Sequence, residues 1–264
     1  MDPITEQFTY RGAPVSYKVT GRGKPLVILH GWGTNSRVMI PLAGSLANLR
    51  TCYIPDLPGF GDSPAPSEPW NIDRYADLVE EFIRSLDSPE VDLLAHSFGG
   101  RITLKLLSRP GISEKIGKVL ITGGAGMKPK RSASFYFKKT LAKILKAPFY
   151  LLPAPLRAKP LEWLRATPLW KMLGSSDYRE LSGVMRETFV LTVTEHLDSI
   201  LDTIHHDILL LWGRDDASTP LYQAERMENG LTNGALVVIE KAGHYAFLDK
   251  PNRFTAIARA YFEN

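Results

Sequence analysis

The chain has 264 residues, of which 44% are apolar and 23% are charged, and its net charge is +4. An apolar fraction of this size supports a buried core, and the single cysteine, Cys52, excludes a fold held by internal disulfides. No apolar run reaches the roughly 18 residues of a membrane-spanning helix, and residues 1–8 lack the apolar core of a signal peptide. We therefore expect a compact cytoplasmic protein.

Short apolar runs alternate with helix-period segments along the chain. Two extended stretches, Phe8–Tyr10 and Val15–Val19, predict an N-terminal hairpin. Later runs predict strands at residues 25–29, 51–54, 91–94, 118–122, 208–212 and 235–239. Because strands that alternate with helices build parallel sheets covered on both faces, the pattern predicts an α/β fold with a mostly parallel central sheet.

Two glycine-containing loops follow the strands predicted at 25–29 and 51–54. The first has the sequence Leu29-His30-Gly31-Trp32-Gly33, and the second covers residues 56–63 with the sequence Asp-Leu-Pro-Gly-Phe-Gly-Asp-Ser. Both loops follow the carboxyl ends of predicted parallel strands. At that edge of an open α/β sheet, loops converge to build a site.

The strand predicted at 91–94 leads into Ala95-His96-Ser97-Phe98-Gly99-Gly100, and a helix-period segment follows. A serine at a sharp strand-to-helix turn presents its hydroxyl above the sheet, and small flanking residues let the neighbouring backbones pass closely. Ser97 has Ala95 two positions before it and Gly99 two positions after it. Ser97 is therefore the candidate nucleophile, although a tight turn ahead of a packed helix would show the same pattern.

A serine nucleophile needs a base that takes its proton and a carboxylate that orients the base. Two candidates follow later predicted strands: Asp216 comes after the strand at 208–212, and His244 comes after the strand at 235–239. Asp215 competes with Asp216 for the acid role. The order serine, aspartate, histidine is the order stated for α/β-hydrolases.

From Phe8 to Phe262, these motifs together resemble the α/β-hydrolase superfamily. The resemblance implies the α/β-hydrolase fold, with a mostly parallel central sheet, helices on both faces and an inserted helical lid. It favours Asp216 over Asp215, because Asp216 lies three residues after Gly213. Ala95 departs from the family pattern, which usually has glycine there.

The resemblance also implies roles for individual residues. Ser97, His244 and Asp216 correspond to the nucleophile, the base and the carboxylate of a catalytic triad. The backbone N–H groups of Trp32 and Phe98 correspond to the oxyanion hole. The implied enzyme is a serine carboxylesterase that cleaves an ester or thioester of a small or medium apolar acyl group through an acyl-enzyme, with no cofactor.

The other histidines do not suggest a second site. We interpret His30 as a structural residue of its loop and His96 as a residue that lines the pocket. His196, His205 and His206 fall in a polar helical stretch and read as surface residues. His205 and His206 are adjacent, and adjacent residues on a helix point apart. Because no further cluster of ligands follows them, we predict no metal site.

A long interval at residues 126–204 contains helical patterns without a convincing strand. We predict that it is the lid, inserted into a core domain formed by residues 1–125 and 205–264. Between Met127 and Glu180, twelve Lys or Arg and three acidic residues give a net charge of +9, which leaves −5 for the rest of the chain. This asymmetry favours an acidic carrier protein or an anionic surface as a partner, although a lysine face in solvent would also produce it. No nucleic-acid-binding module accompanies the charge.

Several functions remain open on the sequence alone, and a cofactor-free haloperoxidase-like or acyltransferase activity is one of them. The loop that contains Trp32 is similar to that of small carboxylesterases, including the pimeloyl-acyl-carrier-protein methyl ester esterases. Carbon–carbon bond hydrolases of ring-cleavage products use the same three residue types. A non-catalytic ligand-binding protein on the same scaffold is a further alternative.

Overall fold

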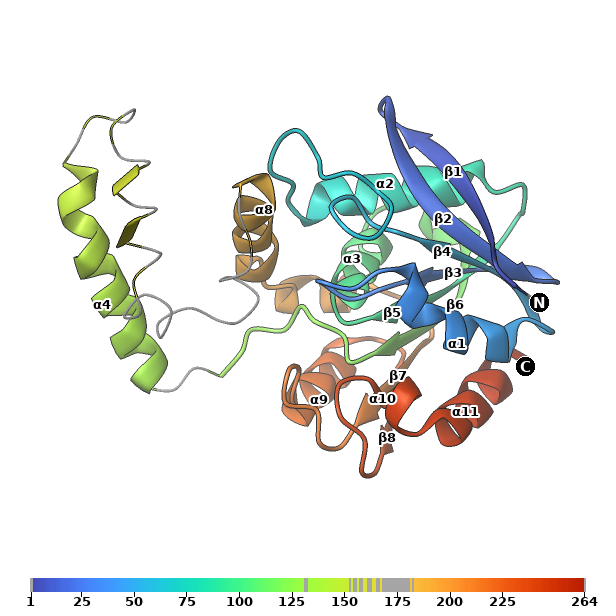
Figure 1. Cartoon of the computed structure of the whole chain (residues 1–264). Coiled ribbons are helices and arrows are strands. Elements are labelled where there is room, and N and C mark those ends of the chain that lie inside the picture. Colours follow the sequence, from blue (N-terminus) through green and yellow to red (C-terminus); the bar gives the residue numbers. More distant parts are fainter. Residues whose placement is uncertain are drawn as a thin grey trace. The chain divides into compact units, whose positions relative to one another are not determined.

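The structure is a computed structural model that describes residues 2–130, 133–151, 153, 156, 159–160, 163–164, 167, 181 and 183–263. The chain divides into two compact units (Figure 1). The larger unit comprises Met1–Lys128 and Glu187–Asn264, and the smaller unit comprises Pro129–Arg186.

An eight-stranded sheet forms the centre of the larger unit, with the strand order β1-β2-β4-β3-β5-β6-β7-β8. β1 pairs with β2, and β2 with β4, in the antiparallel sense, and the remaining neighbours in that order are parallel. The strands are β1 (Ile4–Tyr10), β2 (Ala13–Gly21), β3 (Lys24–Leu29), β4 (Arg50–Pro55), β5 (Val91–His96), β6 (Ile116–Thr122), β7 (Ile208–Gly213) and β8 (Gly234–Ile239). Each predicted strand overlaps one of these, so the predicted α/β fold with a mostly parallel sheet is confirmed.

Helices of the larger unit cover both faces of this sheet (Figure 1). They are α1 (Ser36–Leu46), α2 (Ile72–Ser85), α3 (Phe98–Leu107), α9 (Leu221–Gly230), α10 (Ala246–Asp249) and α11 (Pro251–Glu263), with 3-10 turns at Ser113–Lys115 and Asp198–Thr203. A further helix, α8 (Gly183–Thr194), spans the boundary between the two units.

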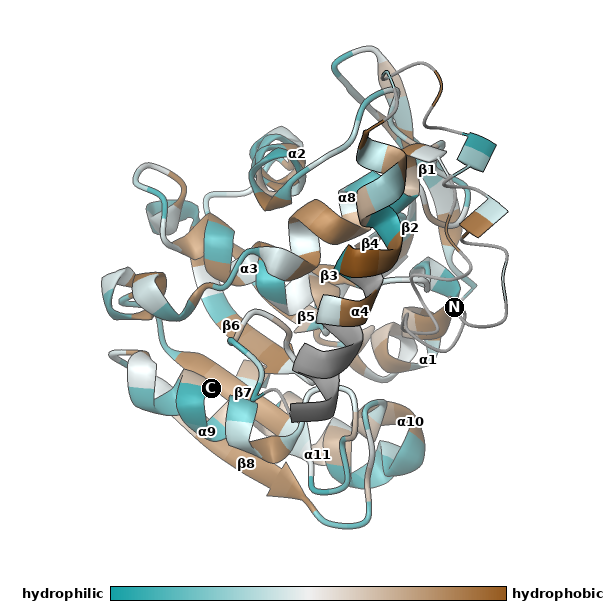
Figure 2. Ribbon diagram, turned by 90° about the vertical axis from the view of Figure 1, so that its left-hand side faces the viewer, coloured by the Kyte–Doolittle hydropathy of each residue, from teal (hydrophilic) through white to brown (hydrophobic). Residues whose placement is uncertain are grey.

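The core explains why these segments form a sheet. Alternate residues of the central strands, such as Leu26 and Ile28 of β3, pack against Met39 of α1 and Phe254 of α11, and all four are fully buried. A buried side chain of this kind contributes about 1.5–3 kcal/mol relative to an exposed one. Figure 2 shows β7 and β8 largely in brown, the hydrophobic colour, whereas α9 beside them carries teal residues.

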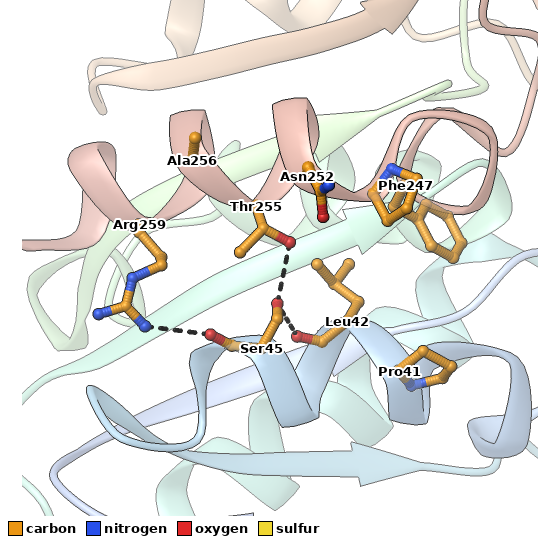
Figure 3. A pocket seen from close by; sticks show the side chains of 9 residues that line it. Pro41, Leu42, Ser45, Phe247, Asn252, Thr255, Ala256 and Arg259 are labelled. Carbon is orange, nitrogen blue, oxygen red and sulfur yellow. Dashed lines mark hydrogen bonds between the residues drawn. The ribbon is translucent and has the colours of Figure 1, made fainter.

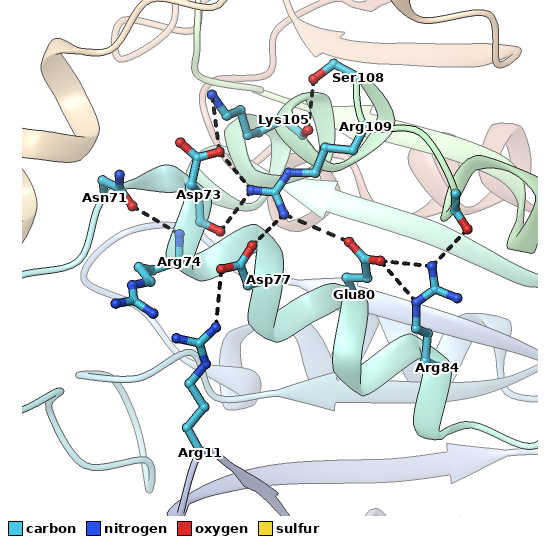
Figure 4. Close-up of polar contacts among 11 residues, drawn as sticks. Arg11, Asn71, Asp73, Arg74, Asp77, Glu80, Arg84, Lys105, Ser108 and Arg109 are labelled. Carbon is cyan, nitrogen blue, oxygen red and sulfur yellow. Dashed lines mark hydrogen bonds and ion pairs between the residues drawn. The ribbon is translucent and has the colours of Figure 1, made fainter.

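Ion pairs join α2 to α3, the helix that begins directly after Ser97. The Arg109 guanidinium lies 2.8 Å from the Asp73 carboxylate and 2.7 Å from that of Asp77, and Lys105 lies 3.4 Å from Asp73 (Figure 4). Arg101 of α3 is buried and donates to the Thr192 carbonyl at 2.8 Å. These contacts hold α3 between α2 and the C-terminal end of α8.

The smaller unit contains α4 (Ala133–Tyr150), which lies within the interval predicted as a lid. The lid boundaries at residues 126–204, and the core domain drawn around them, stay a prediction. Part of the basic segment, including residues 168–180, lies outside the described residues. Among the helices that are described, none has the length and apolar content to cross a membrane.

Candidate active site

The turn between β5 and α3 holds Ser97 in a backbone conformation that few side chains adopt. Its φ is 51° and its ψ is −107°. The Ser97 N–H donates to the Thr122 carbonyl at 3.1 Å, and its carbonyl accepts from the Ala125 N–H at 2.9 Å. Strain of this kind is typical of residues at functional sites. A sharp turn of this geometry turns the serine hydroxyl out of the strand, as the sequence pattern predicts.

Gly99 makes the close approach behind this turn possible. A Cβ atom at Gly99 would lie 2.6 Å from the Cβ and the carbonyl oxygen of Leu29 on the neighbouring strand. Ala95, which replaces the usual glycine on the other side of Ser97, is fully buried and pairs with Leu29 and Ile121 in the sheet. The departure from the family pattern therefore fits within the regular strand.

The structure brings together the three side chains that the sequence singled out. The Nε2 atom of His244 lies 3.0 Å from the Ser97 Oγ, and its Nδ1 atom lies 2.8 Å from the Asp216 Oδ2. Because a carboxylate oxygen only accepts, Nδ1 carries the proton and Nε2 is free to accept the serine proton. Asp215, the rival of Asp216, is exposed.

Asp216 lies in a cradle of donors at the end of β7. Its Oδ1 accepts the N–H groups of Ser218 and Thr219, both at 2.8 Å, and its Oδ2 accepts the Thr219 hydroxyl at 2.8 Å. Burial alone would raise the pKa of Asp216, but the hydrogen bonds and charge of His244, together with the Thr219 donors, lower it below the usual value. The carboxylate therefore stays ionised beside the imidazole.

Thr219 is a site residue that sequence reasoning missed. The spacing of Asp216 and Thr219 in the sequence could have indicated that they are in contact. An aspartate whose side chain accepts the backbone N–H groups two and three residues later forms an Asx-type turn, and Asp216 accepts those of Ser218 and Thr219. The contact of the Thr219 hydroxyl with the Gly123 carbonyl, at 3.0 Å, depends on two distant loops meeting and could not be predicted from that spacing.

The sequence predicts an oxyanion hole from two backbone N–H groups, that of Phe98, the residue after the nucleophile, and that of Trp32 in the loop after β3. Phe98 is the first residue of α3, where N–H groups have no partner within the helix. Within the described part of the chain, neither the Phe98 N–H nor the Trp32 N–H donates a hydrogen bond. Both N–H groups are therefore free to donate, and their role as an oxyanion hole stays a prediction.

Aromatic side chains surround the Trp32 ring beside this turn. Its ring centroid lies 4.9 Å from that of Phe60, 5.1 Å from that of Phe98 and 5.1 Å from that of Phe189. Phe189, on α8, comes from a part of the chain in which we predicted no specific contact with this loop. The cluster gives the candidate site an apolar wall.

Among the remaining histidines, His196 and His205 are exposed, as predicted. The interpretation of His206 as a surface residue is wrong, because it is half-buried and its Nε2 lies 3.1 Å from the Ser113 carbonyl oxygen.

His30 is confirmed as structural: its Nε2 accepts the Leu57 N–H at 3.0 Å and its Nδ1 donates to the Gly31 carbonyl at 2.8 Å. Burial lowers its pKa, which keeps the ring neutral for these two bonds. The interpretation of His96 as a pocket-lining residue is wrong, because its side chain is fully buried beneath His244.

A separate groove of about 440 Å³ lies between α1 and α11 (Figure 3). Its polar atoms bond to one another: the Thr255 hydroxyl donates to the Ser45 hydroxyl at 3.2 Å, and Arg259 donates to the Ser45 carbonyl at 3.2 Å. None of the three candidate catalytic side chains lines this groove. The groove is therefore separate from the candidate active site.

Comparison with known proteins identifies the family. The model of the alpha/beta hydrolase family matches residues 26–257, which include all of the site described above. The chain belongs to the alpha/beta hydrolase family. The resemblance that the motifs indicated is thereby confirmed, and the protein is a hydrolase related to esterases.

Individual alpha/beta hydrolases extend this comparison. The chain is 28% identical to the pimeloyl-[acyl-carrier protein] methyl ester esterase of Neisseria meningitidis serogroup C, over 91% of this chain and 94% of that protein. The esterase from Exiguobacterium antarcticum superimposes with a TM-score of 0.72 at 26% identity, covering 96% of this chain and 97% of the esterase. A meta-cleavage product hydrolase from Pseudomonas fluorescens superimposes with a TM-score of 0.71, covering 98% and 97% of the two chains; at 19% identity it shows the fold alone.

Proposed function

We propose that the protein is a serine hydrolase that cleaves a carboxylic ester or thioester through an acyl-enzyme. The observation that supports this most directly is the continuous chain of short contacts from the Ser97 hydroxyl through the His244 ring to the Asp216 carboxylate, at 3.0 and 2.8 Å. A hydroxyl bonded to a base that is itself bonded to a buried carboxylate is the arrangement that activates a serine.

The proposed reaction has two halves. The Ser97 oxygen attacks the acyl carbonyl carbon, its proton passes to His244, and the carbonyl electron pair forms an oxyanion that the Trp32 and Phe98 N–H groups can bind. Collapse of this intermediate breaks the bond to the leaving alcohol or thiol, which takes the proton from His244. Water then attacks the acyl group with His244 as the base, and collapse of the second intermediate breaks the bond to the Ser97 oxygen, which takes the proton back from His244 as the acid product leaves.

The aromatic cluster around Trp32 supports an apolar acyl group as the substrate class. Trp32 is partly exposed, and its ring contacts Phe60, Phe98 and Phe189 directly beside the nucleophile turn. An acyl chain bound there would remove apolar surface from water, at about 25 cal/mol per Å². We therefore expect longer linear acyl groups to be preferred over acetyl.

Ser97→Ala tests the nucleophile. With p-nitrophenyl esters of two to twelve carbons, the wild type should show a burst of p-nitrophenol followed by turnover, and Ser97→Ala should show neither while keeping its melting temperature. Ser88→Ala, which changes a serine in the loop before β5, is the matched control and should behave as the wild type. A full burst from Ser97→Ala would contradict the proposal.

A fluorophosphonate label separates the alternatives. If Ser97 reacts with the label but no ester is turned over, the carbon–carbon bond hydrolase of ring-cleavage-product type becomes the better interpretation. If Ser97 does not react at all, the serine is not activated, and a ligand-binding role on this scaffold is favoured. Labelling together with ester turnover supports the esterase.

We further propose that the basic segment between Met127 and Glu180 binds an acidic carrier protein that presents the acyl group. The support is its net charge of +9 against −5 elsewhere, and the relative from Neisseria meningitidis, whose name specifies a carrier-linked ester. Turnover of carrier-linked esters should fall as salt increases, whereas turnover of p-nitrophenyl esters should not, because exposed charges are screened beyond about 8–10 Å at physiological salt. Equal salt dependence for both substrates would remove the carrier protein from the proposal.

A further inference from the structure

His96 is the last residue of β5, directly before Ser97, and its side chain is fully buried. Its Nε2 atom lies 3.1 Å from the backbone carbonyl oxygen of His244. Because a carbonyl oxygen only accepts, Nε2 carries the ring proton and Nδ1 is left as a lone pair. Within the described part of the chain, this Nδ1 atom has no hydrogen-bond partner.

The His96 ring also packs against the loop that carries His244. Its centroid lies 4.7 Å from the His244 ring, 4.8 Å from the Tyr245 ring and 5.3 Å from the Phe247 ring. On the other side it faces Gly31, where a Cβ atom would lie 2.9 Å from the His96 Nδ1. His96 therefore touches the loop of the base and the loop of the expected oxyanion hole, while it is joined covalently to the nucleophile.

The electrostatics favour a neutral ring at this position. Burial, with the nearby charge of His244 as the next cause, lowers the pKa of His96 to about 3. Asp216 acts in the opposite direction, but more weakly than burial and His244. A cationic His96 would repel the imidazolium that forms on His244 during the reaction, whereas a neutral donor holds the His244 backbone without that repulsion.

Building on the proposed function, we propose that His96 is a positioning residue for His244. The His96 Nε2–H holds the His244 carbonyl, and the His96 ring supports the His244 ring, so that the base keeps its alignment with Ser97 as it takes and returns the proton. The two nitrogens of His244 fix its ring to Ser97 and Asp216, and His96 adds a third point of attachment at the backbone.

The hydrogen bond to the His244 carbonyl is what supports a role beyond space filling. An unpartnered Nδ1 atom is not specific to the site, because the Nδ1 atom of His206 is also buried without a partner among the described residues. A buried acceptor without a partner destabilises the folded state, a penalty that an apolar side chain of similar volume would avoid. What the imidazole adds over such a side chain is the hydrogen bond to His244. Removing that bond should therefore affect the base more than the stability of the fold.

The test compares three substitutions of His96 with a matched control. His96→Leu replaces the imidazole with an apolar side chain that has no N–H donor. It should lower kcat about 10- to 100-fold with little change in KM, since small misplacements of catalytic groups have effects of about this size. His96→Gln places an amide N–H close to the position of Nε2 and should recover most of kcat. His96→Asn has a shorter side chain and should recover less.

His206→Leu is the control, because the His206 Nε2 also lies 3.1 Å from a backbone carbonyl, that of Ser113, but away from the site. The rate of fluorophosphonate labelling of Ser97 should follow the same order as kcat. If His96→Leu matches His206→Leu in kcat and labelling rate, or if Gln recovers no more than Asn, the positioning role is wrong. If Ser97 of the wild type is not labelled, both the proposed function and the positioning role of His96 are wrong. If Ser97 of the wild type is labelled normally and the His96 variants behave as the wild type, only the positioning role of His96 is wrong. Should His96→Leu not fold, the comparison of Gln with Asn decides.

Discussion

Two aspartates with fully buried carboxylates lie at opposite ends of the parallel strands, and they are stabilised in different ways. Asp92, near the beginning of β5, lies 2.7 Å from the Lys24 ammonium and 2.9 Å from the Arg50 guanidinium, and it accepts the Lys118 N–H at 2.9 Å. Asp216, after the end of β7, is held by neutral donors and by the imidazole of His244.

The difference lies in whether the partner's charge can change. Lys24 and Arg50 are cationic throughout the physiological range, so Asp92 is part of a permanent ion pair that joins β3, β4 and β5. The imidazole of His244 can take up and return a proton, so Asp216 has a partner whose charge can vary during a reaction. A buried carboxylate beside a permanent cation indicates a structural role, and one beside a histidine indicates a functional role.

The largest effect expected from this comparison is on catalysis. Asp216→Asn should lower kcat by roughly 10⁴-fold, because the amide favours the wrong tautomer of His244. The free energy of unfolding should change far less, since the backbone donors of the cradle remain. Steady-state kinetics and urea denaturation measure the two quantities, with Asp215→Asn as the exposed control. A loss of stability without a loss of kcat would reverse the roles assigned to the two aspartates.

The next effect is on stability. Asp92→Asn should lower the free energy of unfolding by about 3 kcal/mol, because it leaves the largely buried Arg50 guanidinium without its carboxylate partner, whereas Lys24 keeps Glu90. Activity per folded molecule should stay within about two-fold, since Asp92 lies at the opposite end of the strands from Ser97. Urea denaturation of Asp92→Asn beside Asp87→Asn, an exposed aspartate in the loop before β5, tests this. A drop in kcat with normal stability would show that the two ends are not independent.

The smallest expected effect is that the contributions of Asp216 and Lys24 to stability change with pH in opposite directions. Hydrogen bonds lower the pKa of Asp216, so its contribution to stability is present above its unfolded pKa of about 3.9 and is lost as pH falls through the folded value. Burial acts to lower the pKa of Lys24, but Asp92 and Glu90 outweigh it and raise the pKa. The Lys24 contribution is therefore complete below its unfolded pKa of about 10.4 and is lost as pH rises through the folded value.

Unfolding free energies measured from pH 3 to pH 11 test this divergence. The difference between the wild type and Asp216→Asn should shrink in acid, and the difference between the wild type and Lys24→Met should shrink in base. A difference for Lys24→Met that stays constant from about pH 9 to pH 11 would contradict the raised pKa, because a lysine with the same pKa in both states makes no pH-dependent contribution to stability.

The order of elements and the main site residues were accessible from sequence because they depend on local patterns. Apolar runs located every strand, and small residues around Ser97 located the turn whose φ is 51°. The choice of Asp216 over Asp215 needed the family pattern, since both residues occupy the same loop. The interpretation of His96 failed because a histidine beside a nucleophile can line a pocket or lie beneath it, and its chain position is the same in both cases.

By itself, the amino-acid sequence determined the α/β class, the parallel sheet and the candidate residues Ser97 and His244, because strand periodicity and turn chemistry act over a few neighbouring residues. The choice of Asp216 needed the family pattern as well. Only the tertiary structure decided which groups surround the site residues: Thr219 on Asp216, Phe189 on Trp32, and His96 on the His244 carbonyl. Each of these contacts joins segments that are separate in the chain or depends on where a side chain points, and such distances and orientations arise when the sheet and its loops pack together.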